Sequence, residues 1–172
     1  MALPPPREPG RYRIGVVCLG NICRSPMADV VLRAKLDDLL DDGTEPALVV
    51  EVASCGTAGW HVGRPMDSRA AATLDRAGYD PTRHRARQYD DGWAAAYDLL
   101  LAMDEDNLAD LGGRGERVAK FRDLDPVDRG ADVPDPYYGG DSGFEEVLQM
   151  VERTADAIVA ELRQRTWESA PR

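Results

Sequence analysis

The sequence predicts a single α/β domain in which helices flank both faces of a four-stranded parallel sheet. Four short apolar runs alternate with helical patterns, and each run is almost continuously hydrophobic. Such runs are typical of parallel strands, which are buried on both sides. At 172 residues the chain has the length of one ordinary domain, so we expect no second one.

The expected elements alternate strictly along the chain. The expected strands cover residues 14–17, 47–53, 97–103 and 117–121, and the expected helices cover residues 25–40, 67–77, 104–111 and 141–165. The first and last helices carry apolar residues at spacings of three and four, and Gly78 ends the second. A turn-rich segment, residues 122–140, precedes the last helix, and a loop this long is usually functional.

The two ends of the chain differ in composition from the expected domain, residues 11–165. Residues 1–10 contain five prolines or glycines and are expected to form a flexible N-terminal arm, and residues 166–172 a C-terminal tail. No apolar stretch has the length of a signal sequence or a membrane span. We expect a cytoplasmic protein that does not bind membranes.

Charge and cysteine content narrow the function classes. A net charge of −10 argues against nucleic acid or an anionic membrane as the main partner. Basic residues gather only at 83–87, Arg-His-Arg-Ala-Arg, which is either a solvated loop or a docking site for acidic substrate segments. Three cysteines without a Cys-x-x-Cys pair and two histidines favour neither a disulfide framework nor a zinc site. We expect no metal and no cofactor.

A phosphate loop is expected directly after the first strand, at residues 18–26, Cys-Leu-Gly-Asn-Ile-Cys-Arg-Ser-Pro. Unpaired N–H groups and the dipole of the following helix favour a phosphate-like anion, and the same field favours a thiolate at Cys18. The planar guanidinium of Arg24 can donate two parallel hydrogen bonds to a phosphoryl group. A Walker-type loop is excluded because neither Lys35 nor Lys120 follows a glycine. The pattern therefore predicts attack by Cys18 on phosphorus.

This loop closely resembles the phosphate loop of the low-molecular-weight protein tyrosine phosphatases, in particular of bacterial, actinobacterial-like members. Residues 135–139, Asp-Pro-Tyr-Tyr-Gly, resemble the general-acid loop of that family, and the resemblance extends over about residues 11–165. It implies a protein tyrosine phosphatase that hydrolyses phosphotyrosine and aryl phosphate monoesters through a cysteinyl phosphate. The implied partners are phosphotyrosine-containing proteins, with inorganic phosphate as product.

The resemblance assigns the catalytic roles to Cys18 as nucleophile, Arg24 as the phosphoryl-binding cation and Asp135 as general acid. On composition alone, Asp125 and Asp132 are rivals for the acid. The implied substrate-binding residues of the loop are Leu19, Gly20, Asn21, Ile22, Cys23 and Ser25.

Aromatic residues are expected to select the substrate. The resemblance places Trp60 on one wall of the cleft and Tyr137 and Tyr138 on the other, where they would sandwich a substrate ring. A deep slot of this kind excludes the short phosphoserine side chain. Ile22 agrees with this, since relatives that act on phosphoarginine carry threonine there. His84 matches a histidine that hydrogen-bonds the loop asparagine and supports the shape of the loop.

Two other functions share parts of this pattern. Arsenate reductases of similar fold have a similar loop, but they pass electrons to further downstream cysteines, and this chain has none after Cys55. A non-catalytic phosphotyrosine-binding module usually lacks the nucleophile or the acid, and both are present here. Cys55 itself is expected to be a small buried residue, and His61 a surface residue. The spacing of Cys18 and Cys23, together with the resemblance, predicts a reversible disulfide between them on oxidation.

Overall fold

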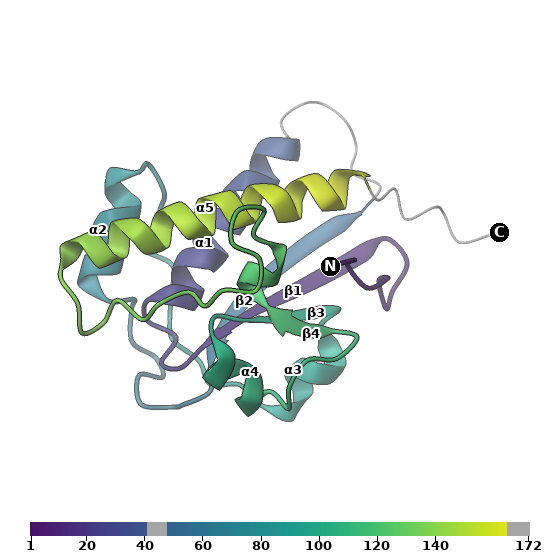
Figure 1. Cartoon of the computed structure of the whole chain (residues 1–172), viewed down its shortest axis with the longest axis horizontal. Coiled ribbons are helices and arrows are strands. Elements are labelled where there is room, and N and C mark those ends of the chain that lie inside the picture. Colours follow the sequence, from purple (N-terminus) through teal and green to yellow (C-terminus); the bar gives the residue numbers. More distant parts are fainter. Residues whose placement is uncertain (41–47, 165–172) are drawn as a thin grey trace.

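The computed structural model describes residues 1–40 and 48–164, which form a central sheet with helices on either side (Figure 1). The strands of this described part are β1 (Arg11–Cys18), β2 (Val49–Gly56), β3 (Leu99–Ala102) and β4 (Val118–Lys120). All pairs are parallel, in the order β2-β1-β3-β4. The prediction of a four-stranded parallel sheet is confirmed.

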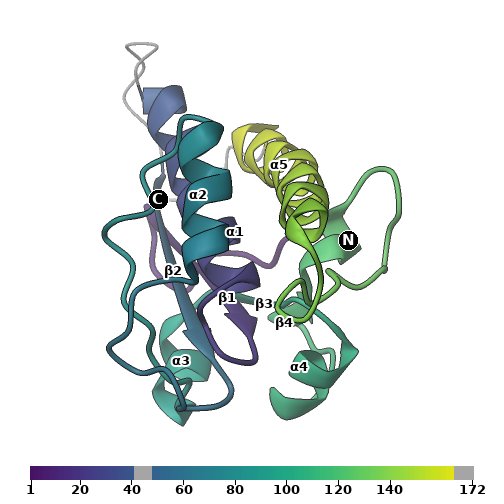
Figure 2. The ribbon, with the colours of Figure 1, turned by 90° about the vertical axis from the view of Figure 1, so that its left-hand side faces the viewer.

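Helices cover both faces of the sheet, as expected (Figure 2). On one face lie α1 (Arg24–Leu40), α2 (Ser68–Arg76) and α5 (Asp141–Gln164), with α5 packed against both α1 and α2. On the other lie the short helices α3 (Asp91–Ala96) and α4 (Glu105–Asp110). A 3-10 turn, η1 (Phe121–Leu124), follows β4 directly.

Residues 14–17 of strand β1 are buried between the two layers of helices, which explains why this part of the strand is an unbroken apolar run. Ile14 and Val16 belong to the main core between the sheet, α1 and α5. Val17 belongs to a smaller core on the other face, with Trp93 of α3. Helix α3 was not predicted, because its six residues include a glycine and are too few for a helical period.

The strand order places the end of β1 where ligands bind in such sheets. The chain passes from β1 to β2 on one side and later returns to β3 on the other side of β1. The order therefore reverses between β1 and β3, and the crevice beyond the carboxyl ends of these strands is the usual ligand site. Cys18 is the last residue of β1.

The N-terminal arm differs from the flexible segment expected from its prolines. Leu3 is buried, with 2% of its surface exposed, and the hydroxyl of Tyr12 donates to Pro4 O at 3.1 Å. The backbone N–H of Arg7 donates to the buried carboxylate of Asp98 at 2.6 Å. Composition did not reveal these partners, because Asp98 lies far along the chain. The arm is part of the folded domain.

The expected end of the first helix at residue 40 agrees with α1. Two other expectations lie outside the described residues: the start of the second strand at residue 47, and the C-terminal tail at 166–172. Within the described part of the chain, no helix is both long and apolar enough to cross a membrane.

Candidate active site

The loop between β1 and α1 curls around the sulfur of Cys18. Asn21 has a φ of 56°, in the left-handed region that asparagine tolerates better than most residues. Its backbone N–H donates to Cys18 Sγ at 3.3 Å. Because α1 begins at Arg24, the first N–H groups of that helix also have no partner within it. The thiol therefore lies among donors, an environment that favours an anion.

The side chain of Asn21 fixes this loop from behind. Its Nδ2 donates to Ser25 Oγ at 2.9 Å and to Ser54 Oγ at 3.0 Å, and its Oδ1 accepts from the backbone N–H of Arg87 at 2.9 Å. Asn21 and Ser25 are fully buried and do not line the pocket. Both were expected among the substrate-binding residues, but their side chains hold the loop instead.

Cys18 is almost completely buried, with 3% of its surface exposed, and opens only toward the pocket. Its sulfur lies 3.0 Å from Ser25 Oγ. A hydroxyl at this distance can donate to a thiolate, and such a charge-assisted hydrogen bond is stronger than a neutral one.

Arg24 is held by an acidic side chain that the sequence did not single out. Its Nη1 donates to Asp104 Oδ2 at 2.5 Å and to Val133 O at 3.1 Å. Burial lowers the pKa of Arg24, but attraction to Cys18 and Asp104 outweighs burial and raises the pKa above its ordinary value. Nη2 lies 3.6 Å from Asp135 Oδ2, too far for a hydrogen bond. One edge of the guanidinium is therefore fixed, and the other remains available for a ligand.

Of the three candidate acids, Asp135 is the one at the pocket. Asp125 is fully buried and accepts two hydrogen bonds at 2.8 Å from Arg153, which hold its pKa well below the ordinary range. Asp132 pairs with Lys120 at 3.0 Å. Asp135 lines the pocket beside Arg24.

The pocket has a volume of about 140 Å³ and brings the expected aromatic residues together with the loop. Trp60 is 73% exposed and Tyr138 is 92% exposed, so both stand at the rim. Tyr137 and Tyr138 meet edge to face, with ring centroids 4.9 Å apart. The residues that line the pocket are Cys18, Leu19, Gly20, Ile22, Cys23, Arg24, Trp60, His61, Asp135, Tyr137 and Tyr138.

The two histidines of the chain lie near different residues of the phosphate loop. His84 Nε2 lies 2.7 Å from the backbone oxygen of Asn21. The expected contact between His84 and Asn21 is therefore present, and it involves the main chain of Asn21 rather than its side chain. Burial lowers the pKa of His84, although this hydrogen bond opposes the shift. His61, expected only at the surface, lines the pocket beside Gly20.

Sequence reasoning also missed Gly56, the last residue of β2. A Cβ atom there would lie 2.7 Å from the backbone oxygen of Leu19 and 3.1 Å from the backbone nitrogen of Asn21. Only glycine leaves room for the phosphate loop. Ser54 and Asp104 were missed as well. Like Gly56, they reach the phosphate loop from the ends of other strands, and no local sequence pattern connects them to it.

The other two cysteines differ from Cys18 in their surroundings. Burial raises the pKa of Cys23 and of Cys55, and the proximity of Cys18 adds to the shift in both. Both are therefore thiols at neutral pH. Cys55 is buried in the smaller core, as expected, whereas Cys23 borders the pocket.

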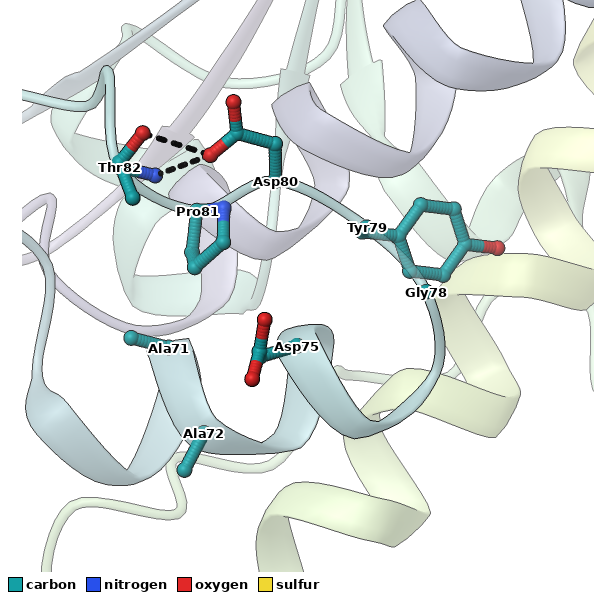
Figure 3. A pocket seen from close by; sticks show the side chains of 8 residues that line it. All are labelled: Ala71, Ala72, Asp75, Gly78, Tyr79, Asp80, Pro81 and Thr82. Atoms are coloured by element: carbon teal, nitrogen blue, oxygen red, sulfur yellow. Dashed lines mark hydrogen bonds between the residues drawn. The ribbon is translucent and has the colours of Figure 1, made fainter.

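A larger hollow of about 520 Å³, between α2 and the segment that follows it, lacks comparable chemistry (Figure 3). Its charged side chains are Asp75 and Asp80, and Asp80 accepts from the backbone N–H and the hydroxyl of Thr82. It contains neither a thiol nor a cation. Among residues 1–40 and 48–164, no cluster of three or more His, Cys, Asp or Glu side chains is arranged to hold a metal ion.

Comparison with known proteins gives a consistent result. Residues 13–167 match the family described as low molecular weight phosphotyrosine protein phosphatase. A low molecular weight protein-tyrosine-phosphatase of Streptomyces coelicolor is 42% identical over 161 residues, which cover 89% of this chain and 94% of that protein. Low molecular weight protein-tyrosine phosphatase A of Mycobacterium tuberculosis is 45% identical over 142 residues, covering 79% of this chain and 82% of that protein.

Solved structures agree in fold. The crystal structure of a low molecular weight phosphotyrosine phosphatase from Vibrio cholerae superposes with a TM-score of 0.79 at 31% identity. The match covers 90% of this chain and 99% of that one.

Proposed function

Because the chain belongs to the low molecular weight phosphotyrosine protein phosphatase family and is a protein tyrosine phosphatase, we propose that it works through a cysteinyl phosphate at Cys18. The observation that carries the proposal is that Asp135, which lies far from Cys18 and Arg24 in the sequence, borders the same small pocket as these two residues.

In the first step, the Cys18 thiolate attacks phosphorus. The S–P bond forms as the P–O bond to the substrate breaks, and the departing phenolate oxygen takes a proton from Asp135. The free edge of Arg24 and the loop N–H groups stabilise charge on the equatorial oxygens, which is usually the largest catalytic contribution.

In the second step, water attacks the phosphorus of the intermediate. Asp135 accepts a proton from this water, the S–P bond breaks, and Cys18 leaves as a thiolate that Ser25 is placed to stabilise. The product is inorganic phosphate. Every proton transfer in this scheme uses side chains of the chain itself.

Selectivity for phosphotyrosine is proposed to come from the rim. An aryl phosphate can place its ring between Trp60 and the tyrosines 137 and 138 while its phosphorus reaches the buried sulfur of Cys18. A phosphoserine side chain is too short to span this distance. We further propose that phosphotyrosine-containing proteins are the substrates. We also propose that oxidation of the enzyme joins Cys18 to Cys23 in a disulfide. The cytoplasmic location stays a prediction.

The test is release of phosphate from a phosphotyrosine peptide in the presence of EDTA, compared with the phosphoserine peptide of the same sequence. Cys18→Ser should abolish turnover but still bind vanadate or phosphate, because Arg24 and the loop remain. Cys55→Ala is the matched control and should retain turnover, because Cys55 is a buried cysteine that does not line the pocket. Substantial turnover by Cys18→Ser, or equal rates on both peptides, would refute the mechanism or the selectivity, respectively.

A further inference from the structure

A second groove, of about 390 Å³, adjoins the active-site pocket. The two share Leu19 and Trp60 as lining residues. The remaining residues of the groove are Thr57, Ala58, Tyr89 and Asp110. Consecutive Cα atoms of a peptide are 3.8 Å apart. When a phosphotyrosine fills the pocket, the side chain of a residue one or two positions away is therefore within reach of this groove.

The groove is fixed relative to the nucleophile by backbone hydrogen bonds. The N–H groups of Thr57 and Ala58 donate to the carbonyl oxygens of Cys18 and Leu19, both at 2.9 Å. The N–H of Tyr89 donates to Gly56 O at 2.7 Å. A side chain bound in the groove therefore helps to set the position of the phosphotyrosine.

The lining residues favour a cation. Asp110 is exposed and forms no ion pair within residues 1–40 and 48–164. Arg114, on the loop that follows α4, pairs instead with Asp123 and Glu105. Trp60 presents a largely exposed indole, and aromatic faces attract arginine and lysine. A carboxylate combined with aromatic rings is suited to a guanidinium or ammonium group.

The basic cluster at residues 83–87 lies in a different groove from the one that would bind the residue next to the phosphotyrosine. Its arginines line a different groove, together with Arg33 and Asp29, which pair with each other at 2.6 Å. That groove shares no lining residue with the active-site pocket. The charged side chain of the groove next to the catalytic cysteine is thus acidic.

We propose that the groove lined by Leu19, Trp60, Tyr89 and Asp110 is a subsite for an arginine or lysine within two residues of the phosphotyrosine. The enzyme then selects phosphotyrosine segments that carry a basic neighbour. This inference rests on the proposed phosphatase function and adds the class of peptide to it.

The experiment measures kcat/KM for phosphotyrosine peptides that differ only in one flanking residue: arginine, glutamine or glutamate, placed in turn at each of the two positions on either side. Phenyl phosphate, which has no flanking residue, reports basal activity. At the best position we expect arginine to exceed glutamine by about 3- to 10-fold, the range of one exposed ion pair plus one cation–π contact. The preference should shrink as salt is raised.

Variants assign the preference to the groove. Asp110→Asn should remove most of the arginine preference, and Asp110→Lys should turn it into a preference for glutamate, with phenyl phosphate turnover unchanged in both. Asp106→Asn is the matched control, because Asp106 is an exposed carboxylate of the same helix that does not line the groove. It should behave as the wild type.

The outcomes separate this inference from the proposed function. The subsite is refuted, and the phosphatase function stands, in either of two cases. In the first, the wild-type enzyme hydrolyses phenyl phosphate but shows the same kcat/KM for all the peptides. In the second, Asp110→Asn keeps the arginine preference. A wild-type preference for glutamate would refute it in favour of the cluster at residues 83–87. If no phosphotyrosine substrate or phenyl phosphate is hydrolysed, the proposed function itself fails.

Discussion

Replacing Asp104 tests whether Arg24 acts only when it is held in place. Asp104 Oδ2 accepts from Arg24 Nη1 at 2.5 Å, while its Oδ1 caps α4 by accepting from the backbone N–H of Asn107 at 2.8 Å. Asp104→Ala removes both contacts. Asp104→Asn has a single side-chain oxygen and can therefore satisfy only one of them.

The magnitude follows from these two contacts. Loss of the helix cap costs about 0.5–2 kcal/mol of stability. A hydrogen bond to a charged group contributes about 1.5–3 kcal/mol. Arg24 is 3% exposed, but the side chain of Asp104 is 21% exposed and Asp135 remains nearby, so we take about 2 kcal/mol for the bond. If this energy orients Arg24 in the transition state, kcat falls about 30-fold in Asp104→Ala.

The assay is steady-state hydrolysis of phenyl phosphate together with urea unfolding. Asp90→Ala is the control, because Asp90 caps α3 through a bond to Gly92 N of 2.8 Å and makes no contact with Arg24. It should lose about 1 kcal/mol of stability and keep its kcat. Asp104→Ala also removes a negative charge beside the pocket, which favours the binding of the phosphate anion. The inhibition constant for phosphate should therefore change by a smaller factor than kcat. If Asp104→Ala loses stability like Asp90→Ala but turns over at the wild-type rate, the positioning argument is wrong.

Three further predictions concern two residues that support the phosphate loop and one buried ion pair. Gly56→Ala should lower kcat/KM at least 10-fold while the protein remains folded by circular dichroism, since its Cβ would lie 2.7 Å from Leu19 O; wild-type kinetics would contradict this. Hydrogen bonds lower the pKa of Asp125 in the folded state, so its contribution to stability is present above about pH 4 and is lost as pH falls further. Asp125→Asn should therefore destabilise by about 3 kcal/mol at pH 7, and less in acid; an equal loss at pH 2.5 would refute the linkage. Burial lowers the pKa of His84, so its contribution is present above about pH 6.5 and is lost as pH falls through the folded-state pKa. NMR titration should find that pKa below 6.5, and His84→Gln should flatten this part of the stability curve; a pKa above 6.5 would contradict the sign.

The parts of the site that the sequence predicted well are those encoded in contiguous stretches. The phosphate loop and its cysteine and arginine lie within seven residues, and the strand before them and the helix after them follow from local patterns. The sheet was likewise predictable, because its strands are buried on both faces. Asp135 could be separated from Asp125 only by resemblance, until the buried contacts of Asp125 with Arg153 were seen.

The parts that the sequence did not predict depend on tertiary contacts. Ser54, Gly56 and Asp104 support the loop from the ends of other strands, and no local pattern connects them to it. The N-terminal arm was misjudged because prolines are common in disordered segments, whereas here Leu3 has a core to enter.

The central claim, a covalent phosphoryl group on Cys18, can be tested by rapid acid quench of Asp135→Asn mixed with p-nitrophenyl phosphate. Nitrophenolate departs without a proton, so the first step should proceed, whereas the second step lacks its base. The account predicts a burst of one nitrophenolate per enzyme and, by mass spectrometry of the digest, one phosphoryl group on the peptide at Cys18. A linear time course with no phosphorylated cysteine, or a phosphoryl group on Cys23 alone, would contradict it.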